Sequence, residues 1–317
     1  MYKYKLSIIV PAYNTGKELE RTLNTLVSQS LTSYEIIIIN DNSSDDTENV
    51  VYNFQKEYNN IKYLKNSENQ GAGLSRNVGF QNSSGKFITF LDSDDWPDLI
   101  AYKTAIDVLE ENAECDFVIW GIKNEFNNQR SSYIRTDYNA YHKITKELAL
   151  SLLCNTYSLD VTVSSYLGSK IFRRDFLKDN NICFNDILFE DVVFSFKSIV
   201  YSKKIILLPN IYTHYYQRTH SIVHSFTQKH ISDMFKAFTL IRELVSKEFT
   251  DYNSDFASLV EKCSRTLFKL LYDNIENPME QKEYLCFYFE ELFRFCSIEK
   301  ILEYMDSERI KNFLLNF

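Results

Sequence analysis

Four consecutive residues, Asp92-Ser93-Asp94-Asp95, are the strongest local sign of chemistry in the sequence. They directly follow the apolar run Phe87 to Leu91, and like charges this close repel one another unless a cation or solvent compensates them. Carboxylate oxygens two positions apart suit Mn²⁺ or Mg²⁺, which take further ligands from water and substrate phosphates. The alternative is a solvated acidic turn that caps the helix expected from Asp98. We therefore predict a divalent-cation site at Asp92 and Asp94.

A second polar cluster begins at Asp41, directly after the β-branched run Glu35 to Asn40. A carboxylate only accepts hydrogen bonds, so Asp41 would select a donor such as a nucleobase N–H or a ribose hydroxyl. The cluster could equally be a loop whose Asp or Ser caps the next helix. A third set follows the run Leu6 to Val10 in the same way and consists of Pro11, Ala12, Tyr13 and Asn14.

The glycine-rich segment Gly71 to Asn77 suggests a dinucleotide site, because it follows a strand and opens a helix. The third glycine of that fingerprint is replaced by Arg76, and the loop Asn66 to Gln70 is too long for the tight turn. We therefore reject an NAD site. The glycine-rich helix start predicts instead that Arg76 approaches the phosphate or sugar of a bound donor.

Two further groups lie later in the chain. Glu190-Asp191 begins an amphipathic segment, where acidic residues can also simply complement the helix dipole. The other group combines aromatic hydroxyls with an imidazole and a cation, and Arg218 in it favours a pyrophosphate contact. Its members are Tyr212, His214, Tyr215, Tyr216, Arg218 and Ser221.

Alternating strands and helices would position these residues. The expected strands are Leu6 to Val10, Glu35 to Asn40, Ile61 to Leu64 and Phe87 to Leu91. The expected helices are Glu18 to Ser30, Asp45 to Tyr58, Gly73 to Gln81 and Asp98 to Glu111. This order predicts an α/β fold with a mostly parallel, Rossmann-like sheet and helices on both faces. Ligands bind beyond the carboxyl ends of such strands, where the polar residues lie.

The pattern becomes mixed in the second half of the chain. We expect a strand at Phe117 to Gly121, a loop or hairpin at Asn124 to Tyr141, a helix at Asp191 to Tyr201, a strand at Lys204 to Leu208 and an extended run at Ile211 to Gln217. Helical periodicity then prevails at Met234 to Val245, Phe256 to Ile275, Tyr284 to Cys296 and Ile298 to Met305. We predict a catalytic domain over 1–225, with a nucleotide-sugar half of about 1–115 and an acceptor half of about 116–225, and a C-terminal helical region over 226–317.

Composition narrows the class of partner. The formal net charge is -8, so the protein lacks the positive electrostatic field that would attract nucleic acid. The six cysteines show no metal-binding spacing and are expected to be buried thiols of a reducing compartment. No run approaches the roughly 18 apolar residues of a membrane span, so we expect a cytoplasmic protein, with the inner face of the membrane as the alternative. Aromatic residues of the C-terminal helices either pack in a core or form an apolar face for oligomerisation or for a lipid-linked acceptor.

Six blocks in order resemble the inverting family 2 glycosyltransferases of the GT-A fold, of the kind that build bacterial surface polysaccharides: LSIIVPAYN, EIIIINDNSSDDT, NQGAGLSRN, GKFITFLDSDDW, GSKIFRRDF and FEDVVF. The match spans roughly residues 4–222. The resemblance implies that Asp41 contacts uracil and that Pro11, Tyr13 and Asn14 pack on the nucleoside. It also implies that Asp94 binds the metal directly and that Asp92, with Ser93 beside it, lies by the ribose or the metal's waters.

The resemblance further implies that Asp191 is the catalytic base. Lys170, His214, Arg218 and Ser221 fall where similar proteins place diphosphate and acceptor contacts, and His214 is a further candidate metal ligand. The family's common Asp-Asp-Gly-Ser is Asn40-Asp41-Asn42-Ser43 here. Asn adopts the left-handed conformation almost as Gly does, so we expect the turn to survive and the identity of the donor to be affected more than activity.

Such an enzyme would move a hexose or N-acetylhexosamine from a UDP-sugar to a hydroxyl of a saccharide or lipid-linked saccharide, in the assembly of capsule, surface polysaccharide or lipo-oligosaccharide. The alternative is a catalytically silent sugar-nucleotide-binding or scaffolding subunit, whose signature would be loss of the metal carboxylates or of the base. Both are present. A nucleotidyltransferase would need a glycine-rich, lysine-bearing phosphate loop near residue 6–15, and none is found there.

Overall fold

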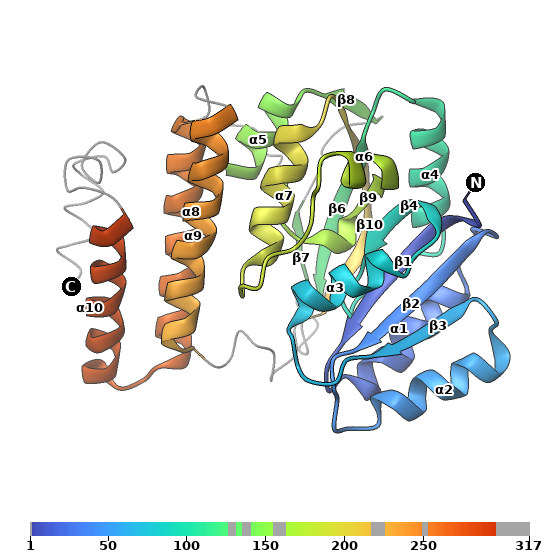
Figure 1. Cartoon of the computed structure of the whole chain (residues 1–317), viewed down its shortest axis with the longest axis horizontal. Coiled ribbons are helices and arrows are strands. Elements are labelled where there is room, and N and C mark those ends of the chain that lie inside the picture. Colours follow the sequence, from blue (N-terminus) through green and yellow to red (C-terminus); the bar gives the residue numbers. More distant parts are fainter. Residues whose placement is uncertain are drawn as a thin grey trace. The chain divides into compact units, whose positions relative to one another are not determined.

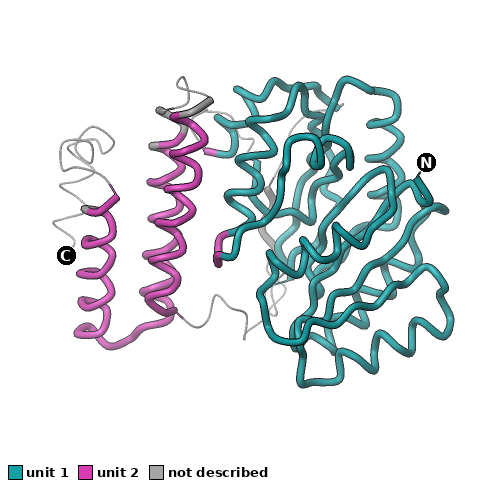
Figure 2. The backbone as a smooth tube through the Cα atoms, viewed as in Figure 1, with its two compact units in different colours: residues 1–153, 159–186, 190–218 teal, residues 154–158, 187–189, 219–317 magenta. Residues whose placement is uncertain are grey.

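Figure 1 shows the computed structural model of the chain, which describes residues 2–125, 131–134, 141–154, 163–216, 226–248 and 253–295. The chain divides into two compact units (Figure 2). Unit 1 comprises residues 1–153, 159–186 and 190–218, and unit 2 comprises residues 154–158, 187–189 and 219–317. The predicted boundary at 225 lies outside the described residues and stays a prediction.

Unit 1 contains one ten-stranded sheet among its described residues. Its strands are β1 (Tyr4–Ala12), β2 (Tyr34–Asn40), β3 (Ile61–Lys65), β4 (Gly85–Phe90), β5 (Trp96–Pro97), β6 (Phe117–Glu125), β7 (Ser131–Ile134), β8 (His142–Ile144), β9 (Lys170–Arg173) and β10 (Ile205–Tyr216). The main path runs β3-β2-β1-β4-β9-β6-β10-β5, with β7 beside β6 and β8 beside β10.

The strand directions confirm an α/β fold but correct the expected sheet. The four strands β3, β2, β1 and β4 pair in parallel, as predicted. The sheet as a whole is mixed, because β9 is antiparallel to both β4 and β6. This strand was not predicted: its four residues are too few to show a period, and they begin and end with a cation. The sheet therefore joins two parallel blocks through a strand of the opposite direction.

Helices cover both faces of the sheet, as predicted. The helices of unit 1 are α1 (Gly16–Val27), α2 (Thr47–Glu57), α3 (Ala72–Gln81), α4 (Ala101–Glu111), α5 (Lys146–Cys154), α6 (Arg174–Asp179) and α7 (Glu190–Tyr201). Ile8 of β1 packs in one buried cluster with Leu23 of α1 and Ile106 of α4. On the other face, a Cβ on Gly79 of α3 would meet Ile9 at 2.4 Å, so this helix needs a glycine there to lie so close.

Two boundaries differ from the predicted ones for a local reason. The segments Lys204 to Leu208 and Ile211 to Gln217 form one strand, β10, rather than two. Pro209, which has no N–H to donate, lies where the pairing of β10 with β6 shifts register. The helix predicted from Asp98 begins at Ala101, after the short strand β5.

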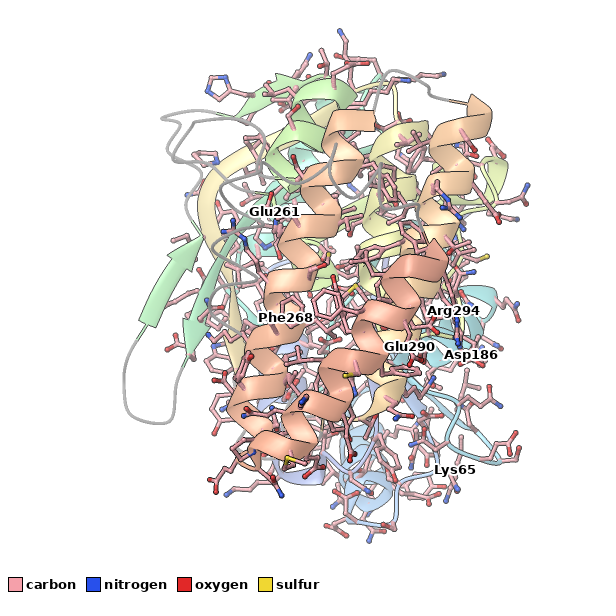
Figure 3. All side chains as sticks on the ribbon, turned by 90° about the vertical axis from the view of Figure 1, so that its left-hand side faces the viewer. Lys65, Asp186, Glu261, Phe268, Glu290 and Arg294 are labelled. Carbon is pink, nitrogen blue, oxygen red and sulfur yellow. The ribbon has the colours of Figure 1, made fainter. Side chains whose placement is uncertain are left out.

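Unit 2 contains α8 (Gln228–Glu248), α9 (Asn253–Asn274) and α10 (Pro278–Phe295). Pro278 begins α10, where its missing N–H costs no helical hydrogen bond. Figure 3 labels Phe268 on α9. Tyr288 of α10 is buried and contacts Phe268 at 4.7 Å and Phe235 of α8 at 5.3 Å between ring centroids. These aromatic rings therefore pack in the core of unit 2. The helix predicted at Ile298 to Met305 lies outside the described residues.

The cysteines are only partly buried as expected. Cys115, Cys154 and Cys263 are buried. Cys183 and Cys286 are exposed, which corrects the prediction, because the first lies in the turn after α6 and the second on a solvent-facing position of α10. Cys296 lies outside the described residues. No helix in the described part of the chain combines the length and the apolar character that crossing a membrane requires.

Candidate active site

Residues Asp92 to Asp95, called the acidic motif below, form the loop that leaves the carboxyl end of β4. Two residues of α1 hold its backbone. Arg21 donates from Nη2 to the carbonyl oxygen of Asp94 at 2.7 Å. The hydroxyl of Thr22 lies 2.9 Å from the carbonyl oxygen of Ser93 and 2.8 Å from that of Asp95. Neither Arg21 nor Thr22 could be identified as a site residue from the sequence, because both lie in an ordinary amphipathic helix.

Negative charge accumulates within this loop. Asp95 is fully buried, and burial, followed by the charges of Asp94 and Asp92, raises the pKa of its carboxyl group well above the usual range. Its Oδ1 accepts a hydrogen bond from the backbone N–H of Tyr216 at 2.7 Å, and its Oδ2 accepts one from the hydroxyl of Tyr166. Asp95 therefore anchors the loop to two later segments of the chain, although the sequence offered it no separate role.

Arg76 joins the acidic motif to the start of α7. Its guanidinium lies 2.7 Å from Oδ1 of Asp92 and 2.5 Å from Oε1 of Glu190. Burial lowers the pKa of Arg76, but the two carboxylates outweigh it and raise the pKa, so the side chain stays charged. The side chain is 6% exposed. The contact of Arg76 with a donor phosphate or sugar stays a prediction, and in this structure the guanidinium faces carboxylates of the protein itself.

Asp191 lies in the first turn of α7, next to Glu190. Its Oδ2 accepts a hydrogen bond from the hydroxyl of Ser165 at 2.7 Å. Burial raises the pKa of Glu190 to about 7, Arg76 opposes this shift, and the charge of Asp191 adds to it. The structure therefore brings the predicted base close to the acidic motif through Glu190 and Arg76.

Lys170 is fully buried at the start of β9. Its ammonium donates to the carbonyl oxygen of Ser164 at 2.7 Å and to that of Tyr166. Burial lowers the pKa of Lys170 to about 7, and the charge of Asp191 opposes this shift. The diphosphate contact of Lys170 stays a prediction, and in this structure the ammonium bonds to backbone carbonyls within the protein.

Asp41 follows β2 and is buried. Its Oδ1 accepts hydrogen bonds from Asn66 Nδ2 at 2.7 Å and from the backbone N–H of Gln70 at 2.9 Å. Its Oδ2 accepts one from the N–H of Gly71 at 2.8 Å. A carboxylate offers about four acceptor positions, so capacity remains for one further donor. Asp41 thereby fixes the loop that begins α3, which the sequence did not predict.

The loops around Asp41 take the backbone conformation that the sequence suggested. Asn42 has a φ of 61°, which confirms that it adopts the left-handed conformation of the glycine it replaces. Asn14 has a φ of 50°, and its side-chain oxygen accepts a hydrogen bond from the N–H of Ser44 at 2.8 Å. Tyr13 is 47% exposed beside it, whereas Pro11 is buried within β1. An exposed ring therefore lies at the end of β1, next to the Asp41 loop.

His214 of β10 stacks on Trp96 with a centroid distance of 5.1 Å. Its Nδ1 lies 2.8 Å from Oε1 of Glu125 and its Nε2 lies 3.1 Å from Oδ1 of Asp98. Both ring nitrogens thus have carboxylate partners, and binding a metal would require the imidazole to leave one of them. The guanidinium of Arg21 also lies over Trp96, at 4.0 Å from the ring centroid. Arg218 and Ser221 lie outside the described residues.

Comparison with known proteins identifies the family. The model of the family described as Glycosyl transferase family 2 matches residues 7–178, which is more than half of the chain. The chain belongs to glycosyl transferase family 2. A family 2 relative from Escherichia coli, UDP-Glc:alpha-D-GlcNAc-diphosphoundecaprenol beta-1,3-glucosyltransferase WfgD, is 31% identical over 193 residues, which cover 57% of this chain and 73% of the relative.

Two further family 2 comparisons differ in how much they cover. The cholesterol galactosyltransferase of Borreliella burgdorferi is 26% identical over 245 residues, which cover 74% of this chain and 66% of the relative. The chain thus spans slightly less than two thirds of that relative. Residues 1–349 of S. aureus TarS, solved in complex with UDP-GlcNAc, superpose with a TM-score of 0.73 and 23% identity over 92% of this chain and 80% of that chain. This likeness confirms the GT-A fold.

The acidic motif of this family 2 protein fits a divalent cation in its donor set. Asp92 and Asp94 provide carboxylate oxygens, which Mg²⁺ and Mn²⁺ prefer. Among the described residues, no group of three or more His, Cys, Asp or Glu side chains could hold a metal alone. Mg²⁺ is commonly bound by one or two carboxylates and completed by water and substrate phosphates, so two carboxylates are sufficient if a diphosphate is present.

Proposed function

We propose that this family 2 protein is an inverting glycosyltransferase that moves a hexose or N-acetylhexosamine from a UDP-sugar to a hydroxyl of a saccharide acceptor. One observation carries the proposal: two separate hydrogen-bonded links run between the acidic motif and the start of α7. The first passes through Arg76. The second passes through the segment Ser164–Tyr166, which bonds to Asp95 and to Asp191. The carboxylates that we expect to act at the donor and at the acceptor are thereby linked to one another by hydrogen bonds.

The proposed reaction is a single displacement. Asp191 takes the proton of an acceptor hydroxyl as its oxygen forms a bond to the anomeric carbon of the donor sugar. The bond from that carbon to the diphosphate breaks on the opposite face, and its electron pair leaves with UDP. The configuration inverts, so an α-linked donor gives a β-linkage. A divalent cation held by Asp94 and Asp92, when bound, would neutralise charge on the departing diphosphate.

Other residues would shape the donor site. Asp41 has acceptor capacity left for a uracil N–H, and the exposed ring of Tyr13 lies at the adjoining strand end, which supports nucleoside binding there. Pro11, Asn14 and Ser93 belong to the backbone that forms these loops. Arg218 stays a proposed diphosphate contact. His214 stays a proposed ligand of the cation, on the condition that it exchanges a carboxylate partner.

The proposed acceptor is based on the acceptor of a similar protein. WfgD is named for transfer from UDP-glucose to a GlcNAc-diphosphoundecaprenol, a lipid-linked saccharide. A similar acceptor would place this protein in the assembly of capsule, surface polysaccharide or lipo-oligosaccharide, in the cytoplasm or at the inner face of the membrane. Contact with the membrane or with a second copy through α8 to α10 is part of this proposal.

The test is calorimetric binding of UDP and of GDP, each with Mn²⁺ and again with EDTA. We expect UDP to bind in the presence of Mn²⁺ and to bind weakly with EDTA, and GDP to bind weakly in both. UDP release from UDP-glucose, UDP-galactose, UDP-GlcNAc and UDP-GalNAc would then identify the donor. If UDP binds but no donor is turned over with any saccharide acceptor, the silent binding subunit becomes the better account. If neither nucleotide binds, the donor site itself is refuted.

A further inference from the structure

We propose that Lys170 is a positioning residue, which fixes the segment Ser164–Tyr166 and through it aligns Asp191 with the acidic motif. The inference rests on the proposed function for the roles of Asp191 and the acidic motif. It gives Lys170 a role other than the contact with the donor diphosphate that the resemblance implies. In this role the ammonium of Lys170 bonds to the protein backbone and not to a ligand.

The first step is the environment of the ammonium group. Lys170 has no exposed surface, and its Nζ donates to two carbonyl oxygens that lie only two residues apart, those of Ser164 and Tyr166. Its own backbone is fixed as well, because its carbonyl oxygen accepts a hydrogen bond from the hydroxyl of buried Thr89 at 2.8 Å. A side chain on a rigid strand thus clamps an irregular segment.

The second step is what the clamped segment carries. The hydroxyl of Ser165 lies 2.7 Å from Oδ2 of Asp191, and the hydroxyl of Tyr166 bonds to Oδ2 of Asp95. The two side chains come from consecutive residues, so any shift of this backbone moves both contacts together. The carbonyl oxygen of Ser165 also accepts a hydrogen bond from Ser195 of α7 at 2.7 Å, which ties the segment to the helix of Asp191.

The third step is the cost of a lysine at this position. Burial lowers the pKa of Lys170 to about 7, although the negative charge of Asp191 opposes the shift, so the folded protein holds the ammonium unfavourably. An apolar side chain of similar length would avoid this cost, but it would leave the carbonyl oxygens of Ser164 and Tyr166 without their buried donor. Holding these two oxygens is therefore what the buried ammonium contributes.

The test compares Lys170→Met with Ser165→Ala and Tyr166→Phe, and uses Lys103→Met as a control at an exposed, paired lysine of α4. For Lys170→Met we expect kcat for UDP release from the active donor to fall about 10- to 100-fold, measured at a temperature where the variant is still folded. Ser165→Ala should lower kcat and leave the Kd of UDP unchanged. Tyr166→Phe should weaken Mn²⁺-dependent UDP binding, on the order of tenfold. The control should change none of these values.

Double variants decide whether Lys170 acts through the segment. If it does, Lys170→Met with Ser165→Ala lowers kcat little further than Lys170→Met alone, because both changes remove the same alignment. Additive losses, or a folded Lys170→Met protein with the kcat of the wild type, overturn the inference. Hydrogen exchange provides a readout independent of activity: amides of residues 163–170 should exchange faster in Lys170→Met. If the wild type binds no UDP, the proposed function fails, whereas unchanged exchange in the variant refutes the clamp itself.

Discussion

Arg76 and Glu190 are 114 positions apart in the chain, and their side chains meet at 2.5 Å. The contact is buried and is continued by Asp92 on the other side of the guanidinium. One cation thus connects the loop after β4 with the first turn of α7. Glu190 is buried and would be hard to keep ionised without this cation, because an ionised group in the interior needs a partner of opposite charge.

Removing this cation should destabilise the protein strongly. We expect Arg76→Met to lower the free energy of unfolding by about 3–5 kcal/mol, because two carboxylates lose their buried partner. Urea unfolding followed by circular dichroism measures the loss. Adding Glu190→Gln to Arg76→Met should recover part of the stability, and no recovery would mean that the two side chains are not coupled.

The stability lost in Arg76→Met should increase as the pH rises. Burial raises the pKa of Glu190 from its ordinary 4.5 to about 7, so between these values the folded state binds more protons than the unfolded state. The contribution of Glu190 to stability therefore falls as the pH rises through this window. Without Arg76 the penalty for its charge increases, and the stability lost in Arg76→Met should be larger at pH 8 than at pH 5. Equal losses at both values would contradict this account.

Asp191 should be required for turnover but not for donor binding. We expect Asp191→Asn to lower kcat at least 100-fold, since a general base commonly contributes about 10²- to 10⁴-fold, and to leave the calorimetric Kd of UDP with Mn²⁺ unchanged. Asp186→Asn, in the loop before α7, provides a control with the same change of charge. Loss of UDP binding in Asp191→Asn would assign Asp191 to the donor site instead.

Asn42 should tolerate glycine better than alanine. Its φ of 61° lies in the left-handed region, which costs a residue with a Cβ about 1–2 kcal/mol. We expect Asn42→Ala to lose about 1 kcal/mol in the free energy of unfolding and Asn42→Gly to stay within a few tenths of the wild type. Asn24→Ala, in the middle of α1, is the control on ordinary helical backbone. A larger loss for glycine than for alanine would show that the asparagine side chain, and not its conformation, is needed.

Asp45 should stabilise the starts of two helices at neutral pH but not in acid. Its carboxylate accepts hydrogen bonds from the N–H of Gly16 at 2.9 Å and from the N–H of Thr47 at 3.1 Å, in the first turns of α1 and α2. Partial burial acts to raise its pKa, but the bonds from Thr47 and Gly16 outweigh burial and hold the pKa below 3.8. A lowered pKa stabilises the fold above that pH, and the contribution is lost as the pH falls through the folded value. Asp45→Ala should therefore cost about 1–2 kcal/mol at pH 7 and distinctly less at pH 3, by thermal unfolding.

The sequence predicts the first half of the fold well because its strands are continuous apolar runs. Runs such as Ile36 to Ile39 are fully buried, and the polar residues after them gather at one edge of the sheet by the geometry of parallel strands. The positions of Asp41 and the acidic motif follow from this rule alone. The left-handed Asn42 is predictable for the same kind of reason, since few residues accept that conformation.

The partners of the site residues are not predictable in this way. The sequence suggests ligand contacts for Lys170 and Arg76, but packing buries both. The ammonium of Lys170 bonds to carbonyls of the irregular segment just before it, and Arg76 pairs with Glu190, 114 positions away. Strand β9 carries no periodic signal. Its antiparallel pairing depends on β4, roughly 80 residues earlier in the chain, and on β6, roughly 50 residues earlier. Ser165 and Tyr166 lie in an irregular segment, so their link between Asp95 and Asp191 emerges only from the folded arrangement.

The insertion of β9 between β4 and β6 has a consequence for how the chain can be made. During synthesis, β4 emerges from the ribosome well before Lys170 to Arg173, and until then one side of it is an open edge of the parallel block. An unpaired edge strand is a template for pairing with other chains. The nascent block of β1 to β4 therefore needs the later segment, or a chaperone, to cover the open edge of β4, and it should not be separable by truncation as an independently soluble fragment.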